Sequence, residues 1–270
     1  MSKDVIHFSH ANGFPAKSYS KFLEALSDEY EVGYVDILAH NPSYPVDRKW
    51  LNPARELVAY LEATYNQPVI GVGHSFGGMV TLLAAELRPD LFKALIILDP
   101  PLVLGAARWL MKVAKRFGFI DRITPAARTI GRKEQWDNHQ EAYDYFKGKK
   151  LFAQFDDDCI WDYVRHGTRE QTNHIELIFS PGTEVDIYRT VPDHMGENLK
   201  RLDVPTAFMV GKNSEVAALG NFKSFVQNKM KRQVIIVDGG HLFPLEKPHK
   251  SAREMKAVLA GLLSQHAKVA

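Results

Sequence analysis

Short apolar runs and amphipathic stretches alternate along the first hundred residues. The apolar runs are rich in Val, Ile and Leu and are bounded by polar or turn-forming residues, at 5–9, 32–36, 69–73 and 91–99. Runs of this kind predict buried strands. Between them, apolar residues recur at helical spacing in 19–26 and 57–61, with Ser18 and the pair Asn52-Pro53 as expected helix starts. Strands that alternate with helices predict a parallel, doubly wound sheet, so the expected fold class is α/β.

The pattern changes between residues 104 and 198, where the strong strand runs stop. Periodicity there predicts three helices and one extended segment, at 106–117, 136–146, 156–164 and 175–179. Two strand-like runs and a final helix follow, at 204–211, 233–237 and 251–263. We therefore expect residues 1–103 and 199–270 to form one core, and residues 104–198 to form a helical cap inserted into it.

The composition is that of a globular chain with nearly balanced charge. Of the 270 residues, 45% are apolar and 24% are charged, which suits one large domain with an insertion. The 34 Lys and Arg residues against 32 Asp and Glu residues give no basis for a nucleic-acid-binding surface. No apolar stretch approaches the roughly 20 residues that span a bilayer, and no signal-peptide pattern precedes the first strand, so we expect a cytoplasmic protein. Cys159 is the only cysteine, which excludes an intrachain disulfide and a cysteine-based zinc site.

The clearest candidate chemistry lies between the third strand run and the helix that follows it. This stretch reads Gly73-His74-Ser75-Phe76-Gly77, a Gly-x-Ser-x-Gly sequence. A serine on a sharp strand-to-helix turn takes strained backbone angles, and glycines two residues before and after it remove the clashes that a Cβ would cause. The start of the helix also offers N–H donors to a developing negative charge. Ser75 is therefore the candidate nucleophile.

This strand, turn and helix resemble the nucleophile elbow of the α/β-hydrolase family. The resemblance extends over the predicted core, and it implies a mostly parallel sheet with a helical cap inserted after the strand that follows the elbow helix. Residues 104–198 match that cap in placement and in helical character. They are rich in aromatic residues, most of which would fill the cap's own small core, while a few would line an apolar pocket for an acyl or alcohol group.

The resemblance also implies two backbone donors for an oxyanion. In the family, a His-Gly-x segment after the first strand supplies one N–H from its third position, and His10-Ala11-Asn12 resembles it with alanine in place of glycine. This alignment gives the role to the N–H of Asn12, whereas an alignment shifted by two residues would give it to Phe14. The second donor is the N–H of Phe76, directly after the nucleophile. His10 itself is expected to be a structural hydrogen-bonding residue and not a base.

A candidate base follows the last strand run. His241 comes after two glycines, which let the loop fold toward a serine from a distant part of the chain. A histidine can take the serine proton near neutrality and return it to the leaving group. The segment 240–248 also resembles the histidine loop of the family, which implies the same role for His241.

The carboxylate that would orient His241 has two candidates. The commoner family pattern puts it three residues after the glycine that ends the penultimate strand, and that position is Ser214, which cannot serve. The segment 211–214, Gly-Lys-Asn-Ser, resembles a branch of small esterases in which the acid instead ends the strand after the elbow helix. Asp99 holds that place, and the chain order Ser, acid, His fits the family. Glu215 is the alternative acid, and Asp99, followed by two prolines, could instead be only a turn residue.

Together these residues imply a serine esterase that cleaves a carboxylic ester of modest size through an acyl-enzyme, as a carboxylesterase does. Thioester, lactone or carbon–carbon bond hydrolysis and cofactor-free perhydrolysis would use the same triad, and neither fold nor triad separates them. A non-catalytic binding protein on this scaffold is a further class, although a pure binder need not keep all three residues. The expected partner is a small-molecule ester. No cofactor, metal or nucleic acid is implied, and the sequence does not indicate an oligomeric state.

Overall fold

A six-stranded parallel sheet forms the centre of the molecule, with the strand order β2-β1-β3-β4-β8-β9. The computed structural model describes residues 3–195, 199, 202–216 and 222–267. The strands are β1 (Val5–Ser9), β2 (Glu31–Tyr34), β3 (Val69–His74), β4 (Phe92–Leu98), β8 (Thr206–Gly211) and β9 (Gln233–Val237). The chain runs from β1 to the edge strand β2, returns to β3 and then winds outward to β9. This order confirms the predicted doubly wound sheet, whose winding reverses between β1 and β3.

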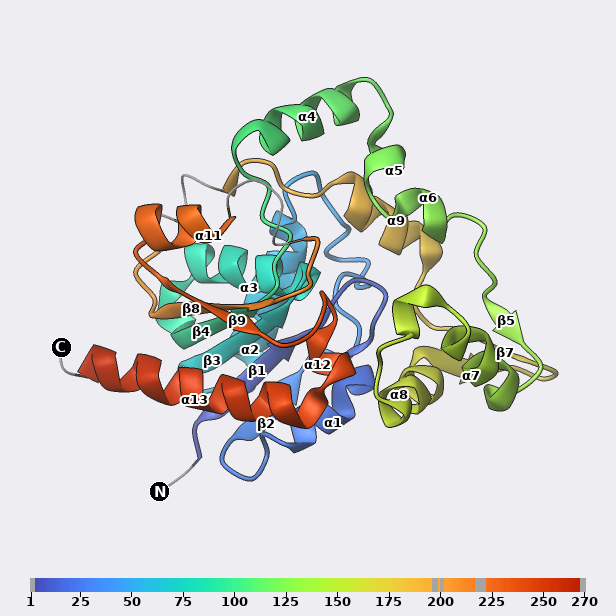
Figure 1. Cartoon of the computed structure of the whole chain (residues 1–270), viewed down its shortest axis with the longest axis horizontal. Coiled ribbons are helices and arrows are strands. Elements are labelled where there is room, and N and C mark those ends of the chain that lie inside the picture. Colours follow the sequence, from blue (N-terminus) through green and yellow to red (C-terminus); the bar gives the residue numbers. More distant parts are fainter. Residues whose placement is uncertain (1–2, 196–198, 200–201, 217–221, 268–270) are drawn as a thin grey trace.

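Helices cover both faces of the sheet (Figure 1). The helices of the core are α1 (Ser20–Glu24), α2 (Leu51–Thr64), α3 (Phe76–Leu87), α11 (Phe222–Ser224), α12 (Phe243–Glu246) and α13 (Pro248–Ala267), with short turns at η1 (Ala16–Tyr19), η2 (Pro89–Leu91) and η5 (Phe225–Lys229). Successive side chains of a strand point to opposite faces, and β4 shows this: Ile96 belongs to one apolar cluster and Ile97 to another. The first cluster also contains residues of α1 and α13, and the second contains residues of α2 and α3.

Between β4 and β8 the chain forms the helical insertion, which occupies the top and right of the molecule in Figure 1. Its elements are α4 (Gly105–Arg116), α5 (Ile120–Ile123), α6 (Ala126–Thr129), β5 (Gln135–Trp136), α7 (His139–Lys147), η3 (Lys150–Phe152), α8 (Asp157–Gly167), β6 (Thr168–Glu170), β7 (Ile175–Leu177) and α9 (Pro181–Arg189). The three short strands form an antiparallel sheet in the order β5-β7-β6. Asn198, the predicted end of the insertion, lies outside the described residues.

The helix starts differ from those predicted. Trp50 precedes α2 in a left-handed conformation (φ 57°), and Asn52 lies inside the helix, where its N–H donates to Asp47 Oδ1 at 2.9 Å. The cap of this helix end therefore comes from a side chain five residues earlier, which the local pattern of polar residues does not reveal. Ser18 is not a cap either, because it lies within the short turn η1 that leads into α1.

The predicted helix over 136–146 starts three residues late. Trp136 pairs with Ile175 in the small antiparallel sheet, and the helix α7 begins at His139. Asn138 caps it, because its side-chain oxygen accepts a hydrogen bond from the N–H of Glu141 at 3.0 Å. A buried aromatic residue fits the apolar face of a helix and a strand equally well, so periodicity alone placed Trp136 in the wrong element.

Aromatic side chains join the insertion to the core. Phe152, Phe155 and Tyr163 of the insertion lie with their ring centroids 5.1–6.0 Å from that of Phe14, which follows β1. These residues belong to the same buried cluster as the sheet residues on that face. We expected most aromatic residues of the insertion to fill a small core of its own, whereas these three fill a core that is shared with the sheet. Trp109 belongs to neither, because it is 72% exposed.

Candidate active site

Ser75 lies on the sharp turn between β3 and α3. Its backbone angles are φ 53° and ψ −117°, which an L-residue rarely adopts. A Cβ on Gly73 would lie 2.5 Å from the carbonyl oxygen of Gly77, and a Cβ on Gly77 would lie 2.1 Å from the carbonyl oxygen of Ser9. Both glycines are thus required by close backbone approach, as the Gly-x-Ser-x-Gly spacing predicts. The turn is fixed further by the N–H of Ser75, which donates to the carbonyl of Leu98 on β4 at 2.9 Å.

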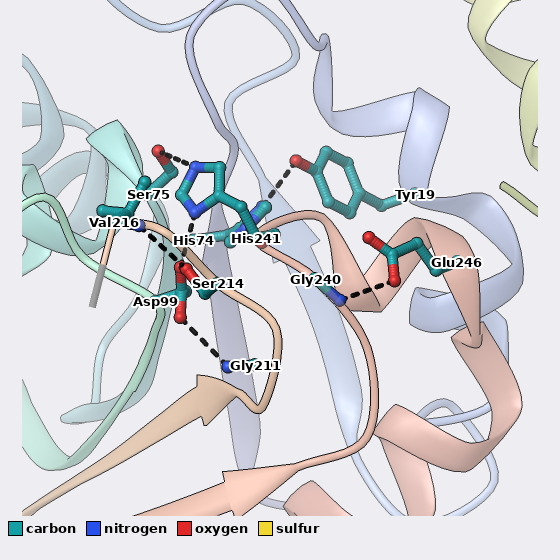
Figure 2. Close-up of polar contacts among 10 residues, drawn as sticks. All are labelled: Tyr19, His74, Ser75, Asp99, Gly211, Ser214, Val216, Gly240, His241 and Glu246. Atoms are coloured by element: carbon teal, nitrogen blue, oxygen red, sulfur yellow. Dashed lines mark hydrogen bonds and ion pairs between the residues drawn. The ribbon is translucent and has the colours of Figure 1, made fainter. Parts of the chain in front are cut away.

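Three predicted site residues meet through hydrogen bonds (Figure 2). The Nε2 atom of His241 lies 2.9 Å from the Oγ atom of Ser75, and its Nδ1 atom lies 2.5 Å from Oδ2 of Asp99. Ser75 follows β3, Asp99 follows β4, and His241 lies between β9 and α12, so all three sit at the carboxyl ends of strands. With the carboxylate ionised, Nδ1 of His241 carries the proton and Nε2 is free to accept from the serine hydroxyl.

The carboxylate of Asp99 is buried and fully hydrogen-bonded. Its residue is 0% exposed, its Oδ1 accepts from the N–H of Gly211 at 3.0 Å, and its Oδ2 accepts from the hydroxyl of Ser214 at 2.5 Å as well as from His241. A buried charge is tolerated only when such donors compensate for the lost water. From the sequence, Ser214 was considered only as a residue that cannot be the acid. Its hydrogen bond to the carboxylate of Asp99 was missed.

The alternative acid, Glu215, is not brought to the histidine. Glu215 is exposed, and its carboxylate makes no hydrogen bond or ion pair with any residue that the structure describes. It directly follows Ser214, whose hydroxyl points to Asp99. The loop after β8 thus turns the serine inward and the glutamate outward.

A second buried histidine supports the loop of the first. His74 lies between the hydroxyl of Tyr19, 2.8 Å from its Nδ1, and the carbonyl oxygen of His241, 2.9 Å from its Nε2 (Figure 2). Since a carbonyl only accepts, Nε2 of His74 must donate and Nδ1 must accept from Tyr19. Burial, with a smaller contribution from the nearby His241, lowers the pKa of His74 to about 3, which keeps this neutral form. His74 was not singled out from the sequence, although it occupies the variable position before the serine.

The loop after β1 is held by His10 in a structural role, as expected. His10 Nε2 accepts from the N–H of Leu38 at 2.7 Å, and its Nδ1 lies 2.8 Å from the carbonyl oxygen of Ala11, to which it donates. Burial lowers the pKa of His10 to about 4, so the ring is neutral and both nitrogens are occupied. The carbonyl of His10 also accepts from the N–H of Gly77 at 3.1 Å, which ties this loop to the turn that carries Ser75.

Helix α9 of the insertion packs directly on the same loop. The side-chain amide of Asn12 donates to the carbonyl oxygen of Glu184 at 3.1 Å, and a Cβ on Gly13 (φ 78°) would lie 3.1 Å from the carboxylate carbon of Glu184. The Glu184 carboxylate accepts from Thr129 at 3.2 Å and pairs with Arg132 at 2.6 Å. Burial raises the pKa of Glu184, although the Arg132 charge opposes this. Nothing in the sequence linked these distant positions, so this contact was missed.

Among the residues that the structure describes, no three His, Cys, Asp or Glu side chains are arranged to hold a metal ion. Cys159 is buried with a free thiol in α8, and burial raises the pKa of that thiol.

The chain is similar to a set of known hydrolases. Residues 8–254 match the model of the alpha/beta hydrolase family. The type I acyl-CoA thioesterase mpaH of Penicillium brevicompactum is 26% identical over 185 residues, which cover 62% of this chain and 41% of that protein. The lipase LipV of Mycobacterium tuberculosis is 36% identical over 100 residues, which cover 36% of this chain and 38% of that protein. The matches therefore span about two fifths of the length of these relatives.

Solved structures share the fold over nearly the whole chain. The structure of E-2-(acetamidomethylene)succinate hydrolase superimposes with a TM-score of 0.78 at 15% identity, covering 96% of this chain and 92% of that one. At this identity the likeness concerns the fold alone.

Proposed function

This chain belongs to the alpha/beta hydrolase family, and on that premise we propose that it is a serine hydrolase that cleaves a carboxylic ester of modest size through an acyl-enzyme. The observation that carries the proposal is the hydrogen-bonded series from Ser75 through His241 to Asp99. A nucleophile within reach of a base, with the base oriented by a carboxylate, is the arrangement that activates a serine hydroxyl.

In the proposed reaction, Oγ of Ser75 attacks the ester carbonyl while Nε2 of His241 takes its proton. His241 then gives that proton to the departing alcohol, which leaves Ser75 acylated. A water molecule, deprotonated by the same nitrogen, releases the acid and restores the serine. Asp99 holds the imidazole with Nδ1 protonated and stabilises its positive charge, because it is buried and receives two further hydrogen bonds.

The oxyanion of the tetrahedral intermediate would be stabilised by the backbone N–H groups of Asn12 and Phe76. Phe76 is the first residue of α3, where N–H groups have no partner within the helix. The choice of Asn12 over Phe14 has support in the loop geometry, because the N–H of Phe14 already donates to the carbonyl of Ala11 at 3.1 Å. The contact of Asn12 with Glu184 would help to keep the loop in place.

We assign residues 1–103 and 199–270 to the hydrolase core and residues 104–198 to the cap. Helix α9 of this cap packs on the loop that carries Asn12, so the cap would border the space in which the substrate sits. We therefore infer that the cap helps to select the substrate.

We retain the cytoplasm as the proposed location. In the part of the chain that the structure describes, no helix is long and apolar enough to cross a membrane.

Thioester hydrolysis is the second candidate function. The same triad would serve it, because attack on a thioester carbonyl passes through the same kind of oxyanion. The observation that favours it is the similarity of this chain to proteins described as type I acyl-CoA thioesterases, at 26% and 30% identity.

Covalent labelling tests the proposed nucleophile. A fluorophosphonate probe should add once to the parent protein, as measured by intact mass, and should not add to Ser75→Ala. Ser264→Ala, which changes an exposed serine in α13, is the matched control and should label like the parent. Labelling that persists in Ser75→Ala would rule out this serine as the nucleophile.

A substrate panel separates the two candidate reactions. We expect p-nitrophenyl esters of short and medium acyl length to be hydrolysed, with activity lost in Ser75→Ala. Acyl-thioesters of the same acyl lengths should be measured beside them. Higher kcat/KM for every thioester than for the matching ester would favour thioester hydrolysis as the main activity.

A further inference from the structure

Large apolar side chains that face solvent gather in one part of the cap. Among the described residues, eight large apolar side chains are exposed, and five of them lie between residues 105 and 130: Trp109, Leu110, Phe117, Ile123 and Ile130. Trp109 is 72% exposed and Phe117 is 73% exposed. Single exposed apolar residues are normal on a protein surface, but a concentration of this kind indicates an interaction site. We call the whole stretch of chain from residue 105 to residue 130 the 105–130 segment. It contains α4, α5 and α6.

Helix α4 has two apolar faces, and only one is covered by the protein. Ala107 and Met111 pack against the buried cluster that contains Phe76. Trp109, Val113 and Phe117 follow one another at intervals of four residues, so they form a stripe on a different face of the helix. In Figure 1, α4 lies along the outer limit of the molecule, far from the sheet. Packing within this chain thus accounts for the apolar residues of the first face. It does not account for the apolar residues of the stripe.

The charge of the 105–130 segment is opposite to that of the rest of the chain. The segment has six Lys and Arg residues and one acidic residue, Asp121, whereas the remainder has 28 basic and 31 acidic residues. The side chains of four of the six cations form neither an ion pair nor a hydrogen bond with the described residues: Lys112, Arg116, Arg122 and Arg128. Lys115 pairs with Asp193, and Arg108 donates to the backbone carbonyl of Asp193. Lys112 and Arg116 are exposed and lie, by helical spacing, beside the Trp109 stripe. The segment therefore offers apolar side chains and unpaired positive charge on one helix.

We propose that the 105–130 segment docks on an anionic lipid surface, with α4 lying in the plane of the interface. A helix with an exposed apolar stripe that includes Trp and Phe, flanked by Lys and Arg, inserts its apolar side chains among the acyl chains while its cations contact anionic head groups. With 12 residues, α4 is about 18 Å long, which is too short to cross the roughly 30 Å hydrocarbon core. Binding is therefore peripheral.

A lipid surface fits both observations, and other partners fit only one. A nucleic acid would use the cations but leave the apolar stripe of Trp109, Val113 and Phe117 in water. A second copy of this chain could bury the stripe, but symmetric contact through α4 would bring the unpaired cations of both copies together. An anionic bilayer accepts the apolar side chains and the positive charges at once.

The docking helix lies close in sequence to the candidate active site. Helix α4 begins at Gly105, six residues after Asp99, on the chain that leaves the carboxyl end of β4. The chain between Asp99 and α4 is thus too short to let the docked helix lie far from this end of the sheet. The docking itself does not depend on the proposed hydrolysis, because it uses none of the residues placed in the reaction.

Vesicle binding tests the proposal directly. The full chain should be mixed with vesicles of phosphatidylcholine alone and of phosphatidylcholine with phosphatidylglycerol, and the bound fraction measured by co-sedimentation at low and high salt. We expect binding to the anionic vesicles to be about tenfold stronger and to weaken with salt. Two double variants, Lys112→Glu with Arg116→Glu and Trp109→Ser with Phe117→Ser, should each lower that binding by about tenfold. Their thermal unfolding should match that of the parent, because both pairs are exposed.

Two controls are matched to these variants. Lys223→Glu with Lys229→Glu reverses two exposed charges near β9, and Ile236→Ser removes an apolar side chain that is 50% exposed; both should bind like the parent. Tryptophan emission gives an independent signal, because Trp109 should shift to shorter wavelength on binding and Trp109→Phe should bind without that shift. Equal binding to both kinds of vesicle, or variants of α4 that bind like the controls, would overturn the proposal. So would sedimentation equilibrium that shows a dimer lost in the Trp109 and Phe117 variant, since the stripe would then bind a second copy.

Discussion

At the scale of single residues, the candidate site depends on how firmly Asp99 is held. Its carboxylate receives hydrogen bonds from Gly211, Ser214 and His241, and its residue has no exposed surface. An acid can orient an imidazole only if the acid itself has one position. Glu215, by contrast, is exposed and makes no such contacts among the described residues.

The two carboxylates should therefore differ sharply in their effect on catalysis. Asp99→Asn should lower kcat for ester hydrolysis by about 10⁴-fold, because the amide favours the wrong tautomer of His241. Glu215→Gln should lower it by less than about tenfold, which corresponds to about 1.4 kcal/mol. Steady-state kinetics would measure both, with circular dichroism to show that each variant is folded. The opposite ranking would transfer the role of the acid to Glu215.

Local sequence was enough to propose the reacting residues, but not to predict the contacts that hold them in place. Ser75 and His241 follow from short motifs, because the glycines around them meet backbone constraints within a few residues. Asp99 followed from its place at the end of a strand. The hydrogen bond of Ser214 to Asp99 and the contact of Asn12 with Glu184 join positions more than a hundred residues apart. Such pairings depend on the folded chain and leave no local signal.

At the scale of elements, the turn that carries Ser75 is locked against β1. The N–H of Gly77 donates to the carbonyl of His10 at 3.1 Å, and the space beside Gly77 is filled by the backbone of Ser9 and His10. Helix α3 therefore approaches the end of β1 more closely than any residue with a Cβ allows. This contact sets the position of Ser75 relative to the loop after β1.

Gly77→Ala should accordingly be strongly destabilising. The new Cβ would lie 2.1 Å from the carbonyl oxygen of Ser9, and backbone atoms on both sides cannot rotate away. We expect a loss of about 3 kcal/mol or more in the free energy of unfolding, measured by urea denaturation. Gly261→Ala is the matched control, because a Cβ there meets nothing within 4 Å and alanine favours a helix; it should stabilise by up to about 1 kcal/mol. Equal stability of both variants would contradict this account of the turn.

The four inner strands of the large sheet, β1, β3, β4 and β8, were predictable because each is an apolar run that is buried almost throughout. The strands β5 and β6 of the cap are only two and three residues long, so they carry too little pattern to be detected. The start of α2 was misplaced because the N–H of Asn52, in its first turn, donates to Asp47, which lies outside the helix. The periodicity of apolar residues thus does not predict very short elements, or helix caps that come from residues outside the helix.

At the scale of the whole molecule, three buried histidines should make the fold sensitive to acid. Burial lowers the pKa of His7 to about 3, of His10 to about 4 and of His74 to about 3. In the unfolded chain these groups titrate near 6.5. A histidine with a lowered pKa in the folded state binds its proton more readily when the chain is unfolded. Its contribution to stability is therefore complete above pH 6.5 and is lost as the pH falls toward its pKa in the folded protein.

The free energy of unfolding should therefore fall as the pH is lowered from 7.5 to 5, and each of the three histidines should contribute to that fall. Glu56 acts in the opposite direction, because burial raises its pKa to about 7, so its contribution is lost as the pH rises toward 7. Urea denaturation at the two pH values would measure the net effect. His7→Gln, which lies outside the candidate site, should reduce the loss on acidification. Constant stability across this range in the parent would contradict the prediction.

The core and the cap share one continuous buried cluster. Phe14 from the loop after β1 contacts Phe152, Phe155 and Tyr163 of the cap, and the same cluster includes residues of β1, α1 and α13. An apolar interface of this kind couples the stability of two parts of a chain, because neither part can leave without exposing the other. From the sequence we place the cap at residues 104–198, but the sequence does not predict that its aromatic residues pack on Phe14.

We therefore expect the cap and the core to unfold together. Guanidinium unfolding followed by far-UV circular dichroism should coincide with unfolding followed by tryptophan fluorescence, because three of the four tryptophans lie in residues 104–198 while the dichroism reports the whole chain. Phe152→Ala should lower the stability by about 3–5 kcal/mol in both signals, since it opens a cavity in the shared cluster. Leu151→Ala, at the neighbouring position that is 58% exposed, is the matched control and should change the stability by less than about 0.5 kcal/mol. The opposite result would be a fluorescence transition that comes before the dichroism transition and that Phe152→Ala shifts alone. It would show that the cap unfolds on its own and that the aromatic contacts with Phe14 contribute little to holding it on the sheet.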